Sequence, residues 1–164
     1  MTDEEYMREA LSLAKKAAEL GEVPVGAVAV WDGKIVGRGY NRRETDKNAL
    51  RHAEIAAIDE ACRALGGWRL WKCDLYVTLE PCPMCAGAII NARVRRVIYG
   101  AADEKNGSCG SVVNLFELPY THKPELCGGV LANESAALLS DFFRDLRKKR
   151  EEEKTVGTSE SENA

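Results

Sequence analysis

The chain has 164 residues, of which 45% are hydrophobic and 30% are charged, a composition typical of a one-domain globular protein that excludes a disordered chain. The longest apolar run, residues 23–31, has about half the roughly 18 residues of a membrane span, and eight of the first twenty residues are charged, so we expect no secretory signal. We therefore expect a cytoplasmic protein without a membrane partner, whose net charge of −3 argues mildly against a nucleic-acid partner.

The first half of the chain predicts a helix, a hairpin and a second helix. Thr2 and Glu5 have the spacing of a capping box, and apolar residues then recur every three or four positions until Gly21. Residues 25–31 and 34–38 flank an Asp-Gly turn and predict a β-hairpin. A polar loop over 41–48, a helix over about 49–65 and a buried strand over 74–79 follow.

The second half predicts the remaining strands and helices. Pro81 and Pro83 mark the start of a helix over 84–92, which is apolar around nearly its whole circumference and should be covered on every side. The next segments are expected to be a strand over 94–99, a Gly-rich loop over 100–111, a strand over 126–130 and a helix from 134 to about 150. Strands that alternate with helices of this length predict an α/β fold, a sheet with helices on both faces.

The end of the chain has a different composition. Residues 151–164 contain five Glu, one Lys and one aliphatic side chain larger than Ala, so we expect a disordered acidic tail after a domain of residues 1–150. Without this tail the chain has 22 basic and 21 acidic residues, and a nucleic-acid partner is no longer disfavoured. The basic run over 144–150 is either a solvated helix end or a phosphate contact.

A histidine and two cysteines stand near expected helix starts. His52-Ala53-Glu54 stands at the start of one expected helix, and Pro81-Cys82-Pro83-Met84-Cys85 opens the next. One imidazole and two thiolates suit zinc and leave its fourth position open, and a helix N-terminus favours the thiolate form. A lone Cys-x-x-Cys is also found in redox pairs and in structural zinc sites. The other cysteines are scattered and are expected to be buried or free thiols, namely Cys62, Cys73, Cys109 and Cys127.

Glu54 is the expected proton carrier beside such a metal. His52 and Glu54 are about 200° apart around an ideal helix, yet side chains lean toward the helix N-terminus, so both can reach a metal beyond that end. Zinc bound by two thiolates is formally neutral and acidifies water less than zinc bound by three imidazoles. A carboxylate that assists the water is therefore needed, and the sequence predicts a hydrolytic site rather than a structural one.

These motifs, His-x-Glu followed by Pro-Cys-x-x-Cys, resemble those of the zinc-dependent nucleobase deaminases. Over about residues 3–150 the chain resembles the bacterial tRNA-specific adenosine deaminases of this superfamily. The supporting segments are 24–28, 41–42, 52–55, 76–82, 84–88, 103–107 and 134–144. The resemblance implies a three-layer α/β/α cytidine-deaminase-like fold, with a central mixed sheet of about five strands and helices on both faces.

The resemblance also implies an activity. Members of this family hydrolyse the wobble adenosine of a tRNA anticodon to inosine as homodimers, with one zinc ion per chain, a zinc-bound hydroxide as nucleophile and Glu54 as proton shuttle. Asn41 would contact the target nucleotide, and Asp103 would accept from the ribose 2′-hydroxyl, which favours RNA over DNA as a partner. The other residues that the resemblance places near the substrate are Lys105, His122, Phe143 and Arg144.

Two alternatives remain open from the sequence. A deaminase of free bases or nucleotides, such as cytosine, guanine or deoxycytidylate, would share the zinc site and would not need the basic C-terminal helix. A zinc-stabilised RNA-binding module without catalysis would also account for the three metal donors, and Glu54 would then have no role in turnover.

Overall fold

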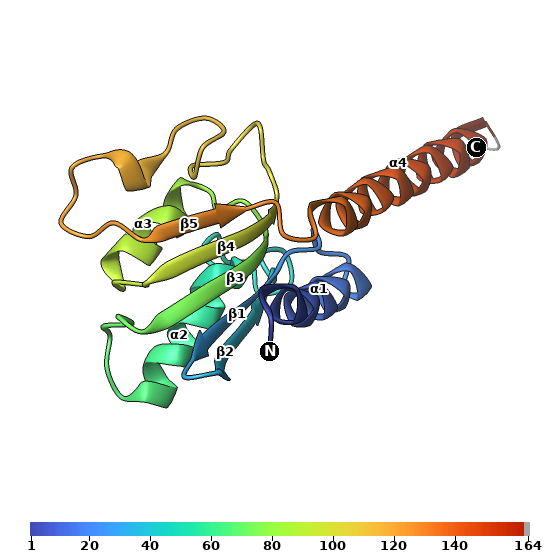
Figure 1. Ribbon diagram of the computed structural model, residues 1–164. Helices are drawn as coiled ribbons and strands as arrows, with labels where there is room; N and C mark the ends of the chain where they lie inside the picture. The colour runs from blue at the N-terminus through green and yellow to red at the C-terminus, as the bar shows by residue number, and fades with distance from the viewer. Residues whose placement is uncertain (163–164) are drawn as a thin grey trace.

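The computed structural model describes the backbone of residues 1–162 and the side chains of residues 1–157. At its centre is a mixed sheet of five strands in the order β2-β1-β3-β4-β5 (Figure 1). β1 is antiparallel to β2 and β3, whereas β4 is parallel to β3 and β5. The strands are β1 (Gly26–Trp31), β2 (Lys34–Tyr40), β3 (Cys73–Leu79), β4 (Arg96–Ala101) and β5 (Glu125–Gly128).

The predicted hairpin and the first helix are confirmed. Asp32 and Gly33 have φ values of 50° and 73°, the left-handed conformation that a tight two-residue turn between twisted strands requires. In α1 (Asp3–Glu19) both bonds of the capping box form, because the Thr2 hydroxyl accepts from the Glu5 amide and the Glu5 carboxylate accepts from the Thr2 amide. Helix α1 is therefore capped at its N-terminus, as the sequence predicts.

α1 and the first turns of α4 (Ala132–Glu162) cover one face of the sheet (Figure 1). Alternate strand residues point to this face and pack on the apolar side of α1, as the two-residue period of a strand requires. Val28, Tyr76 and Ile98 are at most 2% exposed there, beside Met7 of α1. This packing forms the first of two hydrophobic cores.

α2 (Ala53–Leu65) and α3 (Pro83–Asn91) cover the opposite face. α2 lies very close to β2, because a Cβ atom on Gly37 or Gly39 would collide with the backbone carbonyls of α2. Small side chains line the α2 contact, namely Ala53, Ala57 and Ala61, all fully buried. The three-layer α/β/α arrangement with a mixed five-stranded sheet is thus confirmed.

Helix α2 begins later than its apolar pattern predicts. Residues 49–51 form a turn, and the helix starts at Ala53 with His52 in extended conformation as its N-cap. The short helix η1 (Leu115–Glu117), inside the long segment between β4 and β5, was not predicted. The later start of α2 matters for function, because it makes His52 the N-cap of this helix rather than a residue inside it.

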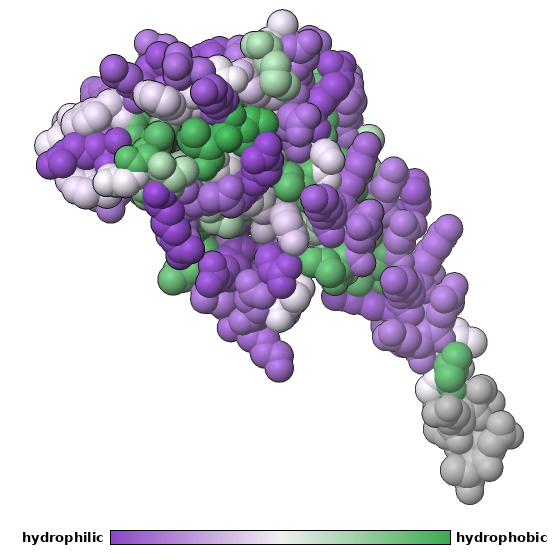
Figure 2. Space-filling view, turned by 90° about the horizontal axis from the view of Figure 1, so that it is seen from below, coloured by the Kyte–Doolittle hydropathy of each residue, from purple (hydrophilic) through white to green (hydrophobic). Residues whose placement is uncertain are grey.

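Helix α4 is longer than predicted and projects from the body (Figure 1). It runs to Glu162 instead of ending at about Arg150, so the expected disordered tail is helical as far as the structure describes it, and residues 163–164 lie outside the described part. The Lys/Arg run over 147–149 precedes glutamates at 151–153 by four positions, a spacing that brings opposite charges together on a helix. Figure 2 shows mostly hydrophilic side chains along this projection.

Within its own chain helix α3 is not covered on every side. Gly87 and Asn91 are exposed and Met84 and Ala88 are half-buried, so one apolar face of α3 has no partner among the described residues of this chain. No helix within residues 1–162 contains an apolar stretch long enough to cross a bilayer.

Candidate active site

The metal-donor residues meet where two helices begin. His52 is the N-cap of α2, Cys82 is the N-cap of α3, and Cys85 lies in the first turn of α3. Neither N-cap side chain forms the usual capping hydrogen bond to its own helix. The imidazole and the thiol are therefore free to face each other, close to the carboxyl end of β3.

The three donor atoms have the spacing of a tetrahedral zinc site. His52 Nδ1 lies 3.6 Å from Cys82 Sγ and 3.5 Å from Cys85 Sγ, and all three ligand atoms lie within 4.8 Å of one another. Bonds of about 2.3 Å to sulfur and about 2.0 Å to nitrogen at tetrahedral angles would separate the S and N atoms by about 3.5 Å. The residues present therefore fit a zinc ion, with one position left for a water molecule or substrate.

The pKa shifts of the three donor residues indicate a site that favours a positive charge. Hydrogen bonds from Cys85 and His52 lower the pKa of Cys82 to about 4, although burial opposes this. The hydrogen bond to the Cys82 thiolate, together with burial, raises the pKa of Cys85. The Cys82 thiolate likewise raises the pKa of His52. Cys82 is thus the more readily deprotonated of the two thiols, and a divalent ion would favour the loss of both protons.

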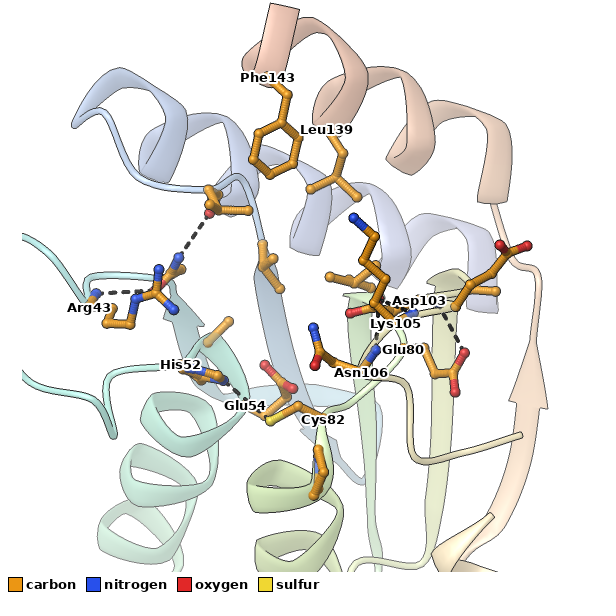
Figure 3. A pocket seen from close by; sticks show the side chains of 18 residues that line it. Arg43, His52, Glu54, Glu80, Cys82, Asp103, Lys105, Asn106, Leu139 and Phe143 are labelled. Atoms are coloured by element: carbon orange, nitrogen blue, oxygen red, sulfur yellow. Dashed lines mark hydrogen bonds between the residues drawn. The ribbon is translucent and has the colours of Figure 1, made fainter. Parts of the chain in front are cut away.

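Glu54 stands beside these donors in the first turn of α2. Its side chain is 4% exposed, and burial raises the pKa of its carboxyl group, while a hydrogen bond from Cys85 acts in the opposite direction. Figure 3 shows the carboxylate between His52 and Cys82, directed into the cavity. A carboxyl group whose pKa is raised above its ordinary value holds a proton more readily, which suits a group that carries protons to a substrate.

His52, Cys82 and Glu54 lie at the base of a cavity of about 770 Å³, large enough for a nucleotide (Figure 3). The loop after β2 contributes Asn41 and Arg43 to one wall. The loop after β4 contributes Asp103, Lys105 and Asn106 to the opposite wall, and Leu139 and Phe143 of α4 lie above. Amide, charged and aromatic groups therefore surround the opening, and His52, Cys82 and Glu54 form its floor.

Buried polar groups hold the wall that carries Asn41. The Asn41 amide donates to the Val23 carbonyl at 3.2 Å, and its carbonyl oxygen accepts from the Arg43 amide at 3.1 Å. Glu22, 1% exposed, accepts from the backbone amides of Glu44 and Thr45 at 3.0 and 2.9 Å. Burial raises the pKa of Glu22, but these hydrogen bonds outweigh it and the net pKa is lowered. The loop before His52 is thus fixed to the body.

The structure brings together only part of the predicted substrate contacts. Asn41, Asp103, Lys105 and Phe143 all line the cavity. The cavity of this chain does not include His122. His122 Nε2 lies 2.6 Å from the Val94 carbonyl oxygen, and the His122 ring packs beside Trp71. Val94 precedes β4, so His122 lies near the end of the sheet at which β4 begins. The prediction that places His122 at the substrate has no support from the position of this residue in its own chain.

Arg144 is also outside the cavity, and several lining residues were not predicted as site residues. The Arg144 guanidinium pairs with the Asp141 carboxylate at 3.0 Å on the exposed side of α4. Asn106 and Leu139 line the cavity without having been predicted as site residues. For Leu139 a signal existed, because it precedes Phe143 by four residues and so lies on the same face of a helix.

Comparison with known proteins places this geometry in a family. Residues 1–147 match the family described as MafB19-like deaminase. The chain belongs to this deaminase family. Its match with the tRNA-specific adenosine deaminase of Bacillus subtilis strain 168 has 54% identity over 149 residues and covers 90% of this chain and 92% of the relative.

Two solved structures extend the comparison for this member of the deaminase family. One comes from a study of A-to-I editing by tRNA:A34 deaminases at the wobble position of transfer RNA, with 48% identity and a TM-score of 0.80 over 82% of this chain and 99% of that chain. The other is a guanine deaminase of Bacillus subtilis, with 32% identity and a TM-score of 0.60 over 74% of this chain and 88% of that chain. Both comparisons extend over most of this chain.

Proposed function

We propose that this chain hydrolyses the wobble adenosine of a tRNA anticodon to inosine and ammonia, with zinc held by His52, Cys82 and Cys85 and with Glu54 as proton shuttle. The observation that carries the proposal is the buried Glu54 carboxylate beside three donors spaced for zinc, at the base of a cavity large enough for a nucleotide. The high identity to named tRNA-specific adenosine deaminases supports this substrate.

The reaction requires two proton transfers, and Glu54 is placed for both. Zinc, when bound, supplies the Lewis acidity that makes a water molecule acidic enough to attack near neutral pH. Glu54 accepts a proton from the attacking water as the C6–O bond forms and delivers it to N1 of adenine. Glu54 then transfers the second proton of that water to the exocyclic nitrogen, the C6–N bond breaks, and ammonia leaves. The product keeps the oxygen as the C6 carbonyl of inosine.

The cavity walls offer groups for binding the flipped-out nucleotide. Each polar end of Asn41 uses one hydrogen bond to hold its own loop, which leaves one N–H and one lone pair for the nucleotide. Asp103 Oδ1 accepts from the Lys105 and Asn106 amides, which leaves Oδ2 for a ribose 2′-hydroxyl and favours RNA over DNA. Phe143, 41% exposed, offers a ring on which a base can stack.

The uncovered face of α3 suggests a homodimer. Gly87 and Asn91 leave a flat, exposed surface on a helix that is otherwise apolar, and η1 packs beside this helix. The loop around η1 exposes further apolar side chains, namely Val112, Leu118 and Tyr120. Exposed apolar surface of this kind is typical of an interface, and we propose that a second copy of the chain covers it. With tRNA as substrate, we also propose that the protein acts in the cytoplasm.

Incubation of the purified protein with RNA tests this function. We expect a synthetic anticodon stem-loop with adenosine at the wobble position to gain inosine, which reverse transcription reads as guanosine, and a stem-loop with adenosine only at another loop position to stay unchanged. Free guanine, cytosine and deoxycytidylate, incubated separately, should release no ammonia. Ammonia from a free base without inosine in RNA would favour the alternative function, to which the similarity with a guanine deaminase gives a specific basis.

A further inference from the structure

Glu80 is a buried carboxylate that the proposed reaction does not use. It is 2% exposed and stands at the end of β3, two residues before Cys82. Among the side chains of residues 1–157 it forms no ion pair with a Lys, Arg or His. A buried carboxylate without a cationic partner is costly unless hydrogen bonds replace its lost water, so its hydrogen-bond partners show what it stabilises.

All of its side-chain partners belong to the loop after β4. Oε1 accepts from the Asp103 amide at 3.1 Å and from the Ser111 hydroxyl at 2.5 Å. Oε2 accepts from the amides of Cys109 and Ser111, both at 3.1 Å. The two oxygens of a carboxylate offer about four lone-pair positions, and here four donors from one loop occupy them.

The same loop forms one wall of the substrate cavity. Asp103, Lys105 and Asn106 line the cavity (Figure 3). Glu80 binds the loop at the first of these residues, Asp103, and again beyond them at residues 109 and 111. The structure contains no helix or strand over residues 102–111. Gly107 lies against the carboxylate so closely that a Cβ atom would collide with Glu80 Oε2 and with the Asp103 carbonyl.

We propose that Glu80 is a positioning residue that holds the loop over residues 102–111 in the conformation that binds the RNA nucleotide. It acts through Asp103, Lys105 and Asn106 and does not touch the reacting atoms. Its four acceptor positions are taken by loop donors, whereas the carboxylate of Glu54 is directed into the cavity. This inference rests on the proposed function, because the nucleotide is the ligand that the loop would bind.

The test replaces Glu80 without changing its shape. In Glu80→Gln one acceptor oxygen becomes an NH₂ group that faces backbone N–H donors, so at least one buried donor loses its partner and the loop must move. We expect KM for the anticodon stem-loop to rise roughly tenfold or more, with kcat within about threefold of wild type, because substrate binding is lost while the chemistry is retained. One zinc ion per chain should remain. Glu60→Gln, at an exposed glutamate on α2 away from the loop, is the matched control.

A second variant reaches the same contact from the other side. Gly107→Ala places a methyl group where Glu80 Oε2 lies, so we expect the same rise in KM. Because both changes break one interaction, the double variant should be no worse than the more impaired single variant, whereas independent effects would multiply. This comparison separates positioning from a general loss of stability.

The results that would overturn the inference differ from those that would refute the function. A wild-type protein that forms no inosine refutes the proposed function before any Glu80 variant is tested. With an active wild type, an unchanged KM in Glu80→Gln, a fall in kcat alone, loss of zinc, or multiplicative effects of Glu80→Gln and Gly107→Ala would each overturn the positioning role.

Discussion

At the scale of single residues, the metal donors of the site could be predicted from the sequence, whereas the residues that line the cavity walls could be predicted only in part. His52, Cys82 and Cys85 could be selected because three metal donors must come close together, and short spacings near two helix starts allow this. Val23 and Asn106 could not be selected in the same way. They line the cavity because loops from different strands meet there, and no local pattern encodes such a meeting.

Asp3 provides a prediction on stability and pH. It joins α1 to the sheet, because it accepts from Arg96 Nη1 at 3.1 Å and from the Tyr76 hydroxyl at 2.6 Å. The hydrogen bond with Arg96 is the largest effect that lowers the pKa of Asp3 below its ordinary value of 3.8. The stabilisation is therefore complete above that value and is lost as the pH falls through the lower pKa of the folded state.

We expect Asp3→Asn to lower the free energy of unfolding by about 1 kcal/mol at pH 7, a value reduced for the partial exposure of both side chains. Urea denaturation at pH 7, 5 and 3 measures this. The free energy of unfolding of the variant should fall below that of wild type by the same amount at pH 7 and pH 5. This difference should become smaller below pH 3.8, the ordinary pKa of an aspartate, where Asp3 begins to gain a proton. A difference that grows with acid would contradict this account of the ion pair.

At the scale of helices and strands, local patterns predicted which elements exist and were less accurate about their ends. The capping box of α1 and the Asp-Gly turn are local signals, and both elements have the expected form. The start of α2 was placed too early because Ala49 and Leu50 continue the apolar pattern, whereas in the structure they belong to the turn before His52. The expected end of α4 at about Arg150 rested on the composition of the acidic tail, which does not take account of the four-residue spacing between basic and acidic side chains on a helix.

The contact between β2 and α2 predicts a large effect of a single methyl group. Gly37 lies under α2, where a Cβ atom would meet the Ala57 carbonyl oxygen, which is backbone and cannot rotate away. We expect Gly37→Ala to reduce the free energy of unfolding by about 3 kcal/mol, at the upper end of overpacking effects. Gly67→Ala is the control, because nothing lies within 4 Å of its added Cβ. Chemical denaturation that shows equal stability for both variants would contradict the close packing.

At the scale of the whole molecule, the layered fold places the site at the edge where β3 ends and where α2 and α3 begin (Figure 1). The α/β class was predictable from alternating elements, but the strand order was not, because pairing between β1 and β3 joins segments more than forty residues apart. The mixed sheet was expected only from the resemblance to a known family. The uncovered face of α3 also concerns the whole molecule, since only an assembly can cover it.

The dimer proposal predicts the effect of a bulky residue on α3. We expect Gly87→Arg to convert a dimer to a monomer, as light scattering coupled to gel filtration would show, because Gly87 lies in the exposed face and has open space around it. The helix itself should tolerate Arg, which is a better helix former than Gly. Gly67→Arg, which is equally open but lies after α2, should leave the dimer intact. A wild-type protein that elutes as a monomer would contradict the proposal.

The charge on α4 predicts how RNA affinity depends on salt. Lys148 and Lys149 are exposed on α4, five and six residues beyond the cavity residue Phe143, and we expect them to contact phosphates of the anticodon stem. Each phosphate contact contributes about 0.7 to 0.9 to the slope of log affinity against log salt. We expect Lys148→Gln/Lys149→Gln to make this slope shallower by about 1.5, and Lys34→Gln/Lys72→Gln, at the opposite edge of the sheet, to leave it unchanged. Equal slopes for all three proteins would remove α4 from the RNA interface.

The most direct test of the central claim is inosine formation by the Glu54→Gln variant loaded with one zinc ion per chain. The account predicts that this variant retains zinc and binds the anticodon stem-loop like wild type, but forms inosine at least about a thousandfold more slowly, because no group remains to move the two protons. Turnover within tenfold of wild type in zinc-loaded Glu54→Gln would show that the buried carboxylate is not the proton shuttle and would contradict the proposed mechanism.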